Sequence, residues 1–520
     1  MEFLAVAAEA ATLANIAVAL TGLVLGIVIG ALPGLSSTFA LAVLLPLTFT
    51  MSPTAALLFL GTAYMGSTYG GCFAAILVNT PGTPQSITTT FDGFPMAQRG
   101  EGGLALSIAC IASVLGGLFG IAAFLWLAPP LVEIALLFGP PEYFWLAILG
   151  LTIIASLSEG NLLKGLIAGF LGLLLSQIGV SVVSGDARFT FEQTALIGGI
   201  PFIPATIGLL CLPVAIDMLA DTDQHLAAAL DARRGQVRRA AWIVWADRVN
   251  LLRSSVVGTV IGVIPAAGGA VASLVAYAEA ARAATPAQAY GKGEPGGVIA
   301  SETANNATVG SGLVPTFVLG IPGTPPDAVI LGAMLVHGVQ IGPRLFSNHG
   351  DVVYTLVAGM LFATVMMLPI GLLLGRSIHA LVLRTPKTLL APTVALMTVI
   401  GAFAIQNSYY DVVIMLALGL MGWLMLRYGF PVAPVVLGLL LGPIAEQGFA
   451  QSVIIGQAKG SVVGMFFNTW VSIVLVGCIL AALVLPPLVR ALGRHRYRAG
   501  KEVGKEVGKE VGKEVGHVAE

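Results

Sequence analysis

Two copies of the short motif Pro-Gly-Thr-Pro, at Pro81–Pro84 and Pro322–Pro325, are the places where this chain is best suited to bind a solute. Proline lacks a backbone N–H donor and pushes the preceding residue out of helical geometry, so each motif interrupts the helix before it. The freed N–H groups and the start of the next helix favour negatively charged ligands. Hydroxyl side chains beside both motifs, and after Pro33-Gly34, add further hydrogen-bond donors. The residues that we predict to contact a bound anion are Ser36, Ser37, Thr38, Asn79, Thr80, Gly82, Thr83, Gly323 and Thr324.

A second candidate site is the polar stretch at residues 301–308, which has the sequence SETANNAT and lies beside an apolar run. At helical spacing, Glu302 faces Asn305 and Asn306, three and four residues later. One carboxylate and two carboxamides offer oxygen ligands for a cation, and an ionisable residue within a membrane is functional by default. Asp327, two residues after the second motif, is the main rival acid. The alternative interpretation is that Glu302 only begins a helix near the membrane interface.

The composition indicates that these sites lie within a membrane. The chain has 520 residues, of which 57% are hydrophobic and 10% are charged, and its mean hydropathy is +0.93. A soluble protein is roughly one quarter charged. Residues 10–91 contain no Asp, Glu, Lys, Arg or His, and this run is long enough for several helices of about 20 residues each. We therefore predict an all-α polytopic membrane protein with about 11–12 transmembrane segments.

An internal repeat relates the two motifs to each other. The segment Gly30–Gly34 (GALPG) precedes the first motif, and Gly262–Ala266 (GVIPA) precedes the second. The first pair of matching prolines, Pro33 and Pro265, is the first anchor of the repeat, and its members are 232 residues apart. The second pair, Pro81 and Pro322, is 241 residues apart. The loop charges predict that the two copies have opposite orientations in the membrane. Inverted repeats with broken or re-entrant hairpins at matching positions are the best sequence indication of a secondary transporter's binding site.

Positively charged loops mark the cytoplasmic side of a membrane protein. The densest basic segment, residues 231–239, and the basic residues near the C-terminus are therefore placed inside. Counting apolar runs between these points places Arg99 inside and Glu446 outside, with Arg188 as an exception on the outside. The predicted parts are an N-terminal transmembrane repeat half at 1–219, a basic cytoplasmic loop at 220–250, a C-terminal transmembrane repeat half at 251–490 and a charged low-complexity cytoplasmic tail at 491–520.

Several classes of function are not indicated. The net charge of −1 gives no sign of a nucleic-acid partner. The chain has neither a Walker A phosphate-binding motif nor a zinc-protease HExxH motif, so we predict no enzyme activity, no bound metal and no cofactor other than a coupling ion, Na⁺ or H⁺. Gly22, Gly26 and Gly30 follow one another at intervals of four residues, which predicts close packing of two helices.

These segments resemble the large membrane subunit of the tripartite tricarboxylate transporter family (TctA type). The resemblance rests on GALPGLSST at residues 30–38, on YGGCFAAILVNTPGTP at 69–84, and on ETANNA, LGIPGTP and LVHGVQIGPRLF within 297–346, and it covers most of residues 15–490. It implies a secondary transporter that imports carboxylates with an ion gradient. It also implies two partners, a small four-helix membrane subunit and a periplasmic solute-binding protein.

Three features depart from the pattern of the family, namely Cys72, Ser301 and the segment Pro325–Asp327. An acid at position 327 is repulsive beside an anion site unless it is protonated or binds a cation. The substrate expected from the resemblance is a tricarboxylate or a related organic carboxylate, and Asp327 argues against assuming citrate.

The sequence therefore predicts a permease subunit in the bacterial inner membrane, surrounded by lipid, that carries an organic carboxylate together with a cation. The alternative is an intramembrane enzyme or flippase that acts on a lipid-linked substrate. That alternative requires clustered His, Asp or Arg at the membrane face, and the charge-free run at 10–91 argues against it. A channel is a third possibility, but paired broken hairpins suit alternating access better.

Overall fold

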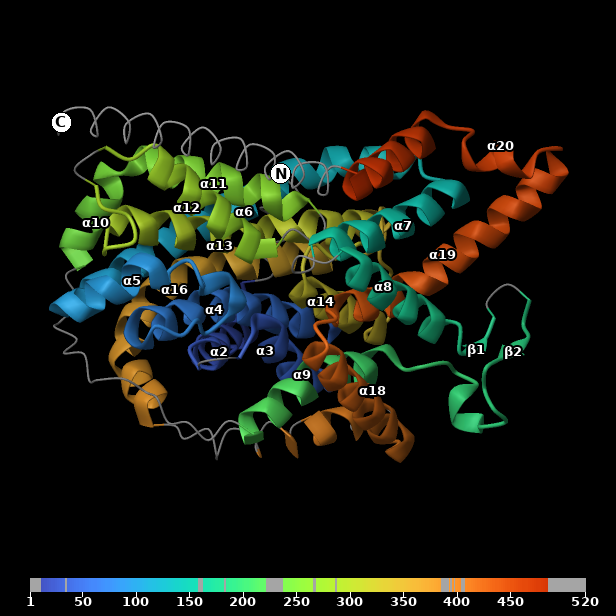
Figure 1. The fold of residues 1–520 in the computed structure, drawn as a ribbon, viewed down its shortest axis with the longest axis horizontal. Helices are drawn as coiled ribbons and strands as arrows, with labels where there is room; N and C mark the ends of the chain where they lie inside the picture. Colours follow the sequence, from blue (N-terminus) through green and yellow to red (C-terminus); the bar gives the residue numbers. More distant parts are fainter. Residues whose placement is uncertain are drawn as a thin grey trace, which may run out of the picture.

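The protein is described by a computed structural model that covers residues 11–32, 35–157, 162–181, 184–220, 237–264, 268–285, 288–384, 392, 395, 396, 398–403 and 407–484. These residues are nearly all helical. One short antiparallel pair, β1 (Gly179–Val180) with β2 (Ala187–Arg188), is the exception in this part of the chain. The prediction of an all-α fold is confirmed (Figure 1).

The helices follow one another in an order that matches the two repeat copies. The elements of the first half are α2 (Leu13–Gly30), α3 (Ser37–Leu44), η1 (Leu45–Thr48), α4 (Pro53–Val78), η2 (Pro84–Ser86), α5 (Thr90–Met96), η3 (Ala97–Glu101), α6 (Gly102–Ala135), α7 (Pro140–Leu157), α8 (Leu162–Ser176), η4 (Thr194–Leu196) and α9 (Phe202–Ala220). Those of the second half are α10 (Val237–Ala246), α11 (Arg248–Val263), α12 (Gly268–Arg282), α13 (Pro295–Leu319), α14 (Pro325–Val336), α15 (Leu345–Asn348), α16 (Gly350–Arg384), α18 (Tyr409–Arg427), α19 (Ala433–Ala458), α20 (Val462–Phe466) and a final helix, Trp470–Val484.

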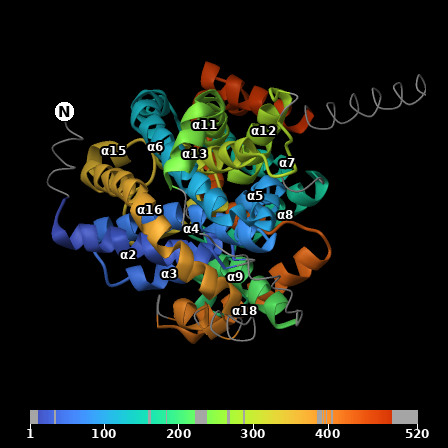
Figure 2. The same cartoon turned by 90° about the vertical axis from the view of Figure 1, so that its left-hand side faces the viewer.

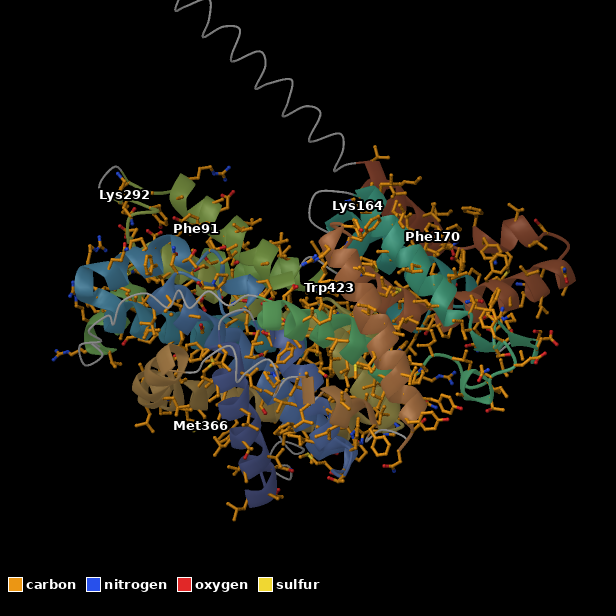
Figure 3. All side chains as sticks on the ribbon, turned by 60° about the horizontal axis from the view of Figure 1, so that its bottom comes forward. Phe91, Lys164, Phe170, Lys292, Met366 and Trp423 are labelled. Carbon is orange, nitrogen blue, oxygen red and sulfur yellow. The ribbon has the colours of Figure 1, made fainter. Side chains whose placement is uncertain are left out.

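Many helices are apolar enough to lie in a bilayer. In the described residues, five helical stretches have the length and composition to cross a membrane: Leu13–Gly30, Thr90–Ala135, Gly350–Gly375, Tyr409–Arg427 and Ala433–Ala458. Shorter apolar helices, among them α3, α8 and α14, lie between them. Large apolar side chains are exposed on the outer surface, including Phe91 and Phe170 on opposite halves of the molecule (Figure 3). The chain is a multi-pass membrane protein.

Two central helices, α4 and α13, each pack against helices of both repeat copies. Helix α4 packs against α2 of its own copy and against α16 of the other copy. Helix α13 packs in the same way against α11 of its own copy and against α6 of the first. Figure 2 shows α2 and α4 beside α16, and α11 and α13 beside α6. The short helices also pack between copies. Helix α12 of the second copy packs against η2 of the first, and α3 of the first copy packs against α14 of the second.

Glycines allow the first helix of each copy to pack closely on its central helix. A Cβ atom at Gly26 of α2 would collide with the carbonyl oxygen of Ala63, and one at Gly258 of α11 would collide with that of Ala304. Gly26 and Gly258 are 232 residues apart, which is the spacing of the first repeat anchor. Close packing along the glycine stripe is confirmed, and the second copy uses the same device.

The remaining helices flank this repeat core. Helices α7 and α8 pack against α19, and α9 packs against α18 (Figure 1). Ion pairs join segments that the loop charges assign to a common side. Arg99 and Arg239 each lie 3.6 Å from a carboxylate oxygen of Glu101, and Arg188 lies 2.8 Å from Glu446. The exceptional outside charge, Arg188, is therefore neutralised by an acid placed on the same side.

Some of the predicted features lie outside the described residues. They include the Pro33-Gly34 and Pro265-Ala266 anchors, most of the basic loop and the whole tail from residue 491. The parts named from the sequence, the sides of the membrane and the number of about 11–12 transmembrane segments stay predictions.

Candidate functional site

Both Pro-Gly-Thr-Pro motifs interrupt the chain with the same local geometry. Helix α4 ends at Asn79 with a φ of 54°, and α13 ends at Gly320 with a φ of 72°, so both caps are left-handed. The next residue in each copy, Thr80 or Ile321, donates its backbone N–H over 3.4 Å to the carbonyl oxygen six residues earlier. This is the bond of a Schellman-type helix end. The predicted breaks are confirmed, and the left-handed cap turns the chain back along its own helix.

The glycine of each motif lets the returning chain lie directly on the helix that it has just left. A Cβ atom at Gly82 would stand 2.8 Å from the Cα atom of Gly71, and one at Gly323 would stand 3.2 Å from the Cα atom of Gly312. The backbone N–H of Gly82 also donates to the carbonyl oxygen of Gly71 at 3.3 Å. Both motif glycines are therefore required for contact between two backbones within one copy.

The starts of α3 and α14 meet on one stretch of α4. Thr324 caps the start of α14, and its hydroxyl lies 3.0 Å from the hydroxyl of Tyr64 on α4. Ser37, at the start of α3, has its hydroxyl 3.4 Å from that of Thr68, one turn further along α4. One helix start from each copy thus reaches the same part of a central helix.

The start of α12 lies between the two breaks. A Cβ atom at Gly268 would stand 3.9 Å from Cγ2 of Thr324 in the second break. A Cβ atom at Gly269 would stand 2.6 Å from Oδ1 of Asn305 and 2.9 Å from Cγ of Gln85, which follows the first break. Three helix starts and both breaks therefore converge inside the protein. The first turn of each helix has N–H groups without partners within that helix, so the convergence favours an anion.

The predicted anion contacts divide into two groups. Six of the nine residues are buried, namely Ser37, Thr38, Gly82, Thr83, Gly323 and Thr324, and Ser36 is partly buried. Ser36 caps α3 by accepting the backbone N–H of Phe39 at 3.0 Å. Asn79 and Thr80 are exposed, because the left-handed cap turns them away from the convergence. The structure therefore brings most of the predicted residues together but not these two.

Glu302 lies at the junction of three segments. It is the eighth residue of α13 and completely buried, which argues against the interpretation that it only begins a helix at the interface. The hydroxyl of Thr89, just after the first break, donates to Oε1 of Glu302, and that of Ser113 on α6 donates to Oε2 at 3.1 Å. Asn306 donates its side-chain N–H to the hydroxyl of Ser113 at 2.8 Å. Glu302 and Asn306 thus share one set of partners.

Asn305 belongs to a different group. Its side chain faces Gly269 of α12, whereas Glu302 and Asn306 face α6. The i+3 spacing places Asn305 beside Glu302 in the sequence, but the structure separates the two. Neither side-chain atom of Asn305 has a hydrogen-bond partner among the described residues.

Asp327 occupies the start of α14. Its Oδ2 accepts the hydroxyl of Thr324 at 2.6 Å, and its backbone N–H donates to the same hydroxyl at 3.4 Å. A negative group is favourable at a helix start. Asp327, which the sequence suggests would repel a substrate anion, therefore stabilises the start of α14. Its other carboxylate oxygen, Oδ1, has no hydrogen-bond partner in the described part of the chain.

A further acid ties the first break to the second copy. Asp92 on α5 is buried and accepts the backbone N–H groups of Gly293 at 2.7 Å and Glu294 at 2.8 Å. The hydroxyl of Tyr277 on α12 donates to it at 2.9 Å. Sequence reasoning missed Asp92, and it also missed three partners of the predicted sites: Tyr64, Gln85 and Ser113. Each of them is recognisable only through a contact with a distant segment.

Comparison with known proteins identifies the family of this chain. The family model of the "Tripartite tricarboxylate transporter TctA family" matches residues 16–437. The chain belongs to that family. It is 33% identical over 492 residues to an uncharacterised 52.8 kDa protein in the TAR-I ttuC' 3' region of Agrobacterium vitis. The aligned residues make up 93% of this chain and 95% of the relative. A second Agrobacterium vitis relative, an uncharacterised protein in the TAR-II ttuC' 3' region, is 30% identical over 240 residues, or 45% of this chain and 96% of the relative. No solved structure matches.

As a member of the TctA family, this chain is the component of a tripartite transporter, and its buried charges suit that role. Within the described residues, the charged side chains that are buried are all acidic: Asp92, Glu142, Glu302, Asp327 and Asp411. A buried charge without an opposite charge is very unfavourable. Among the described residues, Glu302 and Asp327 accept hydrogen bonds from hydroxyls, and neither is bonded to a basic side chain.

The same region of this TctA-family protein holds buried polar atoms that have no hydrogen-bond partner among the described residues. Besides Asn305, they include Oε1 of Gln85, Oδ1 of Asn306 and Oδ1 of Asp327. Each buried polar group that lacks a hydrogen bond costs about 1–3 kcal/mol. A ligand that supplies hydrogen bonds to these atoms would offset this cost.

Proposed function

We propose that this chain is the permease subunit of a binding-protein-dependent secondary transporter that imports a tricarboxylate or a related organic carboxylate, driven by a cation gradient. The observation that carries the proposal is the convergence of the starts of α3, α12 and α14 with both breaks. Two copies contribute to it, and the positive ends of the helix dipoles suit a carboxylate.

The exchanged packing supports alternating access. Because η2 packs on α12 and α14 packs on α3, each break contacts the short helix of the other copy. A movement of one copy relative to the other separates a break from its partner helix without breaking a central helix. Such a movement opens the convergence to one side at a time.

The buried acids support coupling to a cation. The carboxyl of Glu302 is surrounded by hydroxyls, and that of Asp327 lies beside the helix start that faces the solute. A solute anion and an uncompensated carboxylate repel each other in a medium of low dielectric constant. Binding of Na⁺ or H⁺ at either acid removes this repulsion, so uphill movement of the solute follows the inward movement of the ion.

The family supplies the remaining parts of the proposal. Membership of a tripartite system supports two partners, a small four-helix membrane subunit and a periplasmic solute-binding protein that delivers the carboxylate. We place the complex in the bacterial inner membrane with the C-terminus of this chain in the cytoplasm. The sequence offers four candidate cation ligands: Glu302, Asn305, Asn306 and Asp327. We retain Glu302, Asn306 and Asp327 as cation ligands and leave out Asn305, whose side chain faces α12.

Uptake into right-side-out membrane vesicles tests the proposal. Vesicles that contain this chain and its small partner are mixed with purified binding protein and a panel of labelled di- and tricarboxylates, and a Na⁺ or pH gradient is imposed separately. We expect accumulation of at least one carboxylate that needs both the binding protein and one of the gradients. Uptake that persists after both gradients are collapsed would contradict secondary transport.

A further inference from the structure

One buried side chain near the convergence is placed to bind something that the protein itself does not supply. Asn305 lies in the middle of α13 and is completely buried, and neither its Oδ1 nor its Nδ2 has a hydrogen-bond partner among the described residues. Its side chain points at the start of α12, where the Cβ position of Gly269 is 2.6 Å from Oδ1. A carboxamide in this position offers two N–H donors and an acceptor directly in front of a helix start.

Gln85 brings a second carboxamide to the same place from the other copy. Its Cγ atom is 2.9 Å from the same Cβ position at Gly269, and its Oε1 is buried without a partner in the described part of the chain. The backbone of Gln85 is fixed, because the hydroxyl of Ser273 on α12 donates to its carbonyl oxygen at 3.0 Å. The two carboxamides therefore flank one glycine, one from each repeat copy.

We propose that Asn305 and Gln85, with the first turn of α12, form the subsite that holds a carboxylate group of the solute. This inference rests on the proposed transport function and assigns the residues that recognise its substrate. The Nδ2 donor of Asn305 and the first N–H groups of α12 can bind carboxylate oxygens, and the start of a helix favours negative charge. The unpartnered carbonyl oxygens of Asn305 and Gln85 can accept a hydrogen bond from a donor group of the same solute. Recognition is by neutral donors, so the empty site contains no charge that must be desolvated.

A cation is the less suitable occupant of this subsite. The positive end of α12 opposes a cation, whereas it favours a carboxylate. The cation ligands around Glu302 face α6, on another side of α13. Asn305 and Asn306 are thus adjacent in the sequence and serve different ligands, which provides a matched pair of variants.

Gly269 sets the width of the subsite. It lies in the helical first turn of α12, with no positive φ, so a side chain there is excluded by space and not by backbone strain. An added methyl group would stand 2.6 Å from Asn305 Oδ1 and 3.0 Å from the hydroxyl of Thr308. Gly269→Ala therefore displaces the side chains of Asn305 and Gln85 from the first turn of α12, without replacing any hydrogen-bonding side chain.

Uptake kinetics with the matched variants test the assignment, using as probe citrate or the carboxylate of the panel that the wild-type complex accumulates. We expect Asn305→Ala, Gln85→Leu and Gly269→Ala each to raise KM by about tenfold or more, as the loss of one or two hydrogen bonds predicts. The cation concentration for half-maximal uptake, measured at a saturating carboxylate concentration, should stay within about twofold. Asn306→Ala should show the reverse pattern, with the larger change in the cation requirement.

Thiol labelling gives a readout that does not depend on turnover. Gln85→Cys, in a background without the four native cysteines, should react with a maleimide about tenfold more slowly at a carboxylate concentration about ten times Kd. Ile87→Cys, at an exposed position on the same turn, is the control and should react at an unchanged rate.

The outcomes separate this inference from the proposed function. Ligand-dependent protection of Gln85→Cys but not of Ile87→Cys, with the split in KM, supports the subsite. Gradient-driven uptake by the wild type without protection, or equal kinetics for Asn305→Ala and Asn306→Ala, overturns the subsite alone. A wild-type complex that accumulates no carboxylate of the panel overturns the proposed function and the subsite with it.

Discussion

Removal of the Ser113 hydroxyl is the most direct perturbation of the proposed cation site. This hydroxyl donates to Oε2 of Glu302 at 3.1 Å and accepts a side-chain N–H of Asn306 at 2.8 Å, so it holds both candidate cation ligands. A hydrogen bond to a charged group contributes about 1.5–3 kcal/mol. Since 1.4 kcal/mol corresponds to a factor of ten, Ser113→Ala should raise the cation concentration for half-maximal uptake by about tenfold to a hundredfold.

A serine on the same helix provides the control. The hydroxyl of Ser107 is also buried in α6, but it donates to the carbonyl oxygen of Gly103 at 2.8 Å and not to an acid among the described residues. Ser107→Ala removes the same atom from the same helix and should change the cation requirement by less than about twofold. The comparison therefore separates a ligand effect from the general effect of a cavity in α6.

The assay measures initial uptake of the accepted carboxylate against Na⁺ at fixed pH, and then against pH at fixed Na⁺. If Ser113→Ala raises the half-saturating Na⁺ concentration, the coupling ion is Na⁺. If it shifts the pH dependence of uptake instead, the coupling ion is H⁺. Glu302→Gln keeps the size and hydrogen bonding of the side chain but removes its charge, so it should make uptake largely independent of that ion. Equal half-saturating concentrations for Ser113→Ala and Ser107→Ala, or unchanged coupling in Glu302→Gln, would refute the assignment and leave Asp327 as the coupling acid.

Two other predictions concern packing. Gly82→Val or Gly323→Val should each lower the free energy of unfolding by about 1–3 kcal/mol and abolish uptake, because the new side chain meets the backbone of the preceding helix. The control is Gly198→Val, at a position where an added Cβ atom has no described neighbour within 4 Å. Its melting temperature and uptake should match those of the wild type. Normal uptake in both motif variants would show that the breaks tolerate a side chain. Asp92→Asn weakens the anchoring of the segment before α13, so trypsin should cleave after Lys292 several times faster in solubilised protein; an unchanged cleavage rate would mean that Asp92 does not hold this segment.

The breaks and the repeat were predictable because their causes are local. Proline and glycine determine backbone geometry wherever they stand, so the two Pro-Gly-Thr-Pro motifs predict interrupted helices without any tertiary information. The glycine stripe predicts close packing of α2 for the same reason. The 232-residue spacing that relates Gly26 to Gly258 is also visible in the sequence, although it takes the structure to show that both face a central helix.

The partners of the site were not predictable because they depend on packing between distant segments. Thr89 and Glu302 are separated by 213 residues, and Tyr64 and Thr324 by 260, so no local pattern pairs them. Helical spacing also misled at Asn305. Three residues advance a helix by about 300°, which leaves Asn305 about 60° from Glu302 and lets neighbouring helices place the two side chains in different groups.

One short turn joins the two proposed subsites. Gln85, beside the start of α12, and Thr89, bonded to Glu302, belong to the segment that follows the first break. The hydroxyl of Ser273 on α12 fixes this turn at both Gln85 and Thr88. A cation at Glu302 orients Thr89 and therefore the turn that carries Gln85, and a carboxylate at Gln85 orients the same turn from its other end. Linkage is reciprocal, so the factor by which the cation lowers the Kd of the carboxylate must equal the factor by which the carboxylate lowers that of the cation.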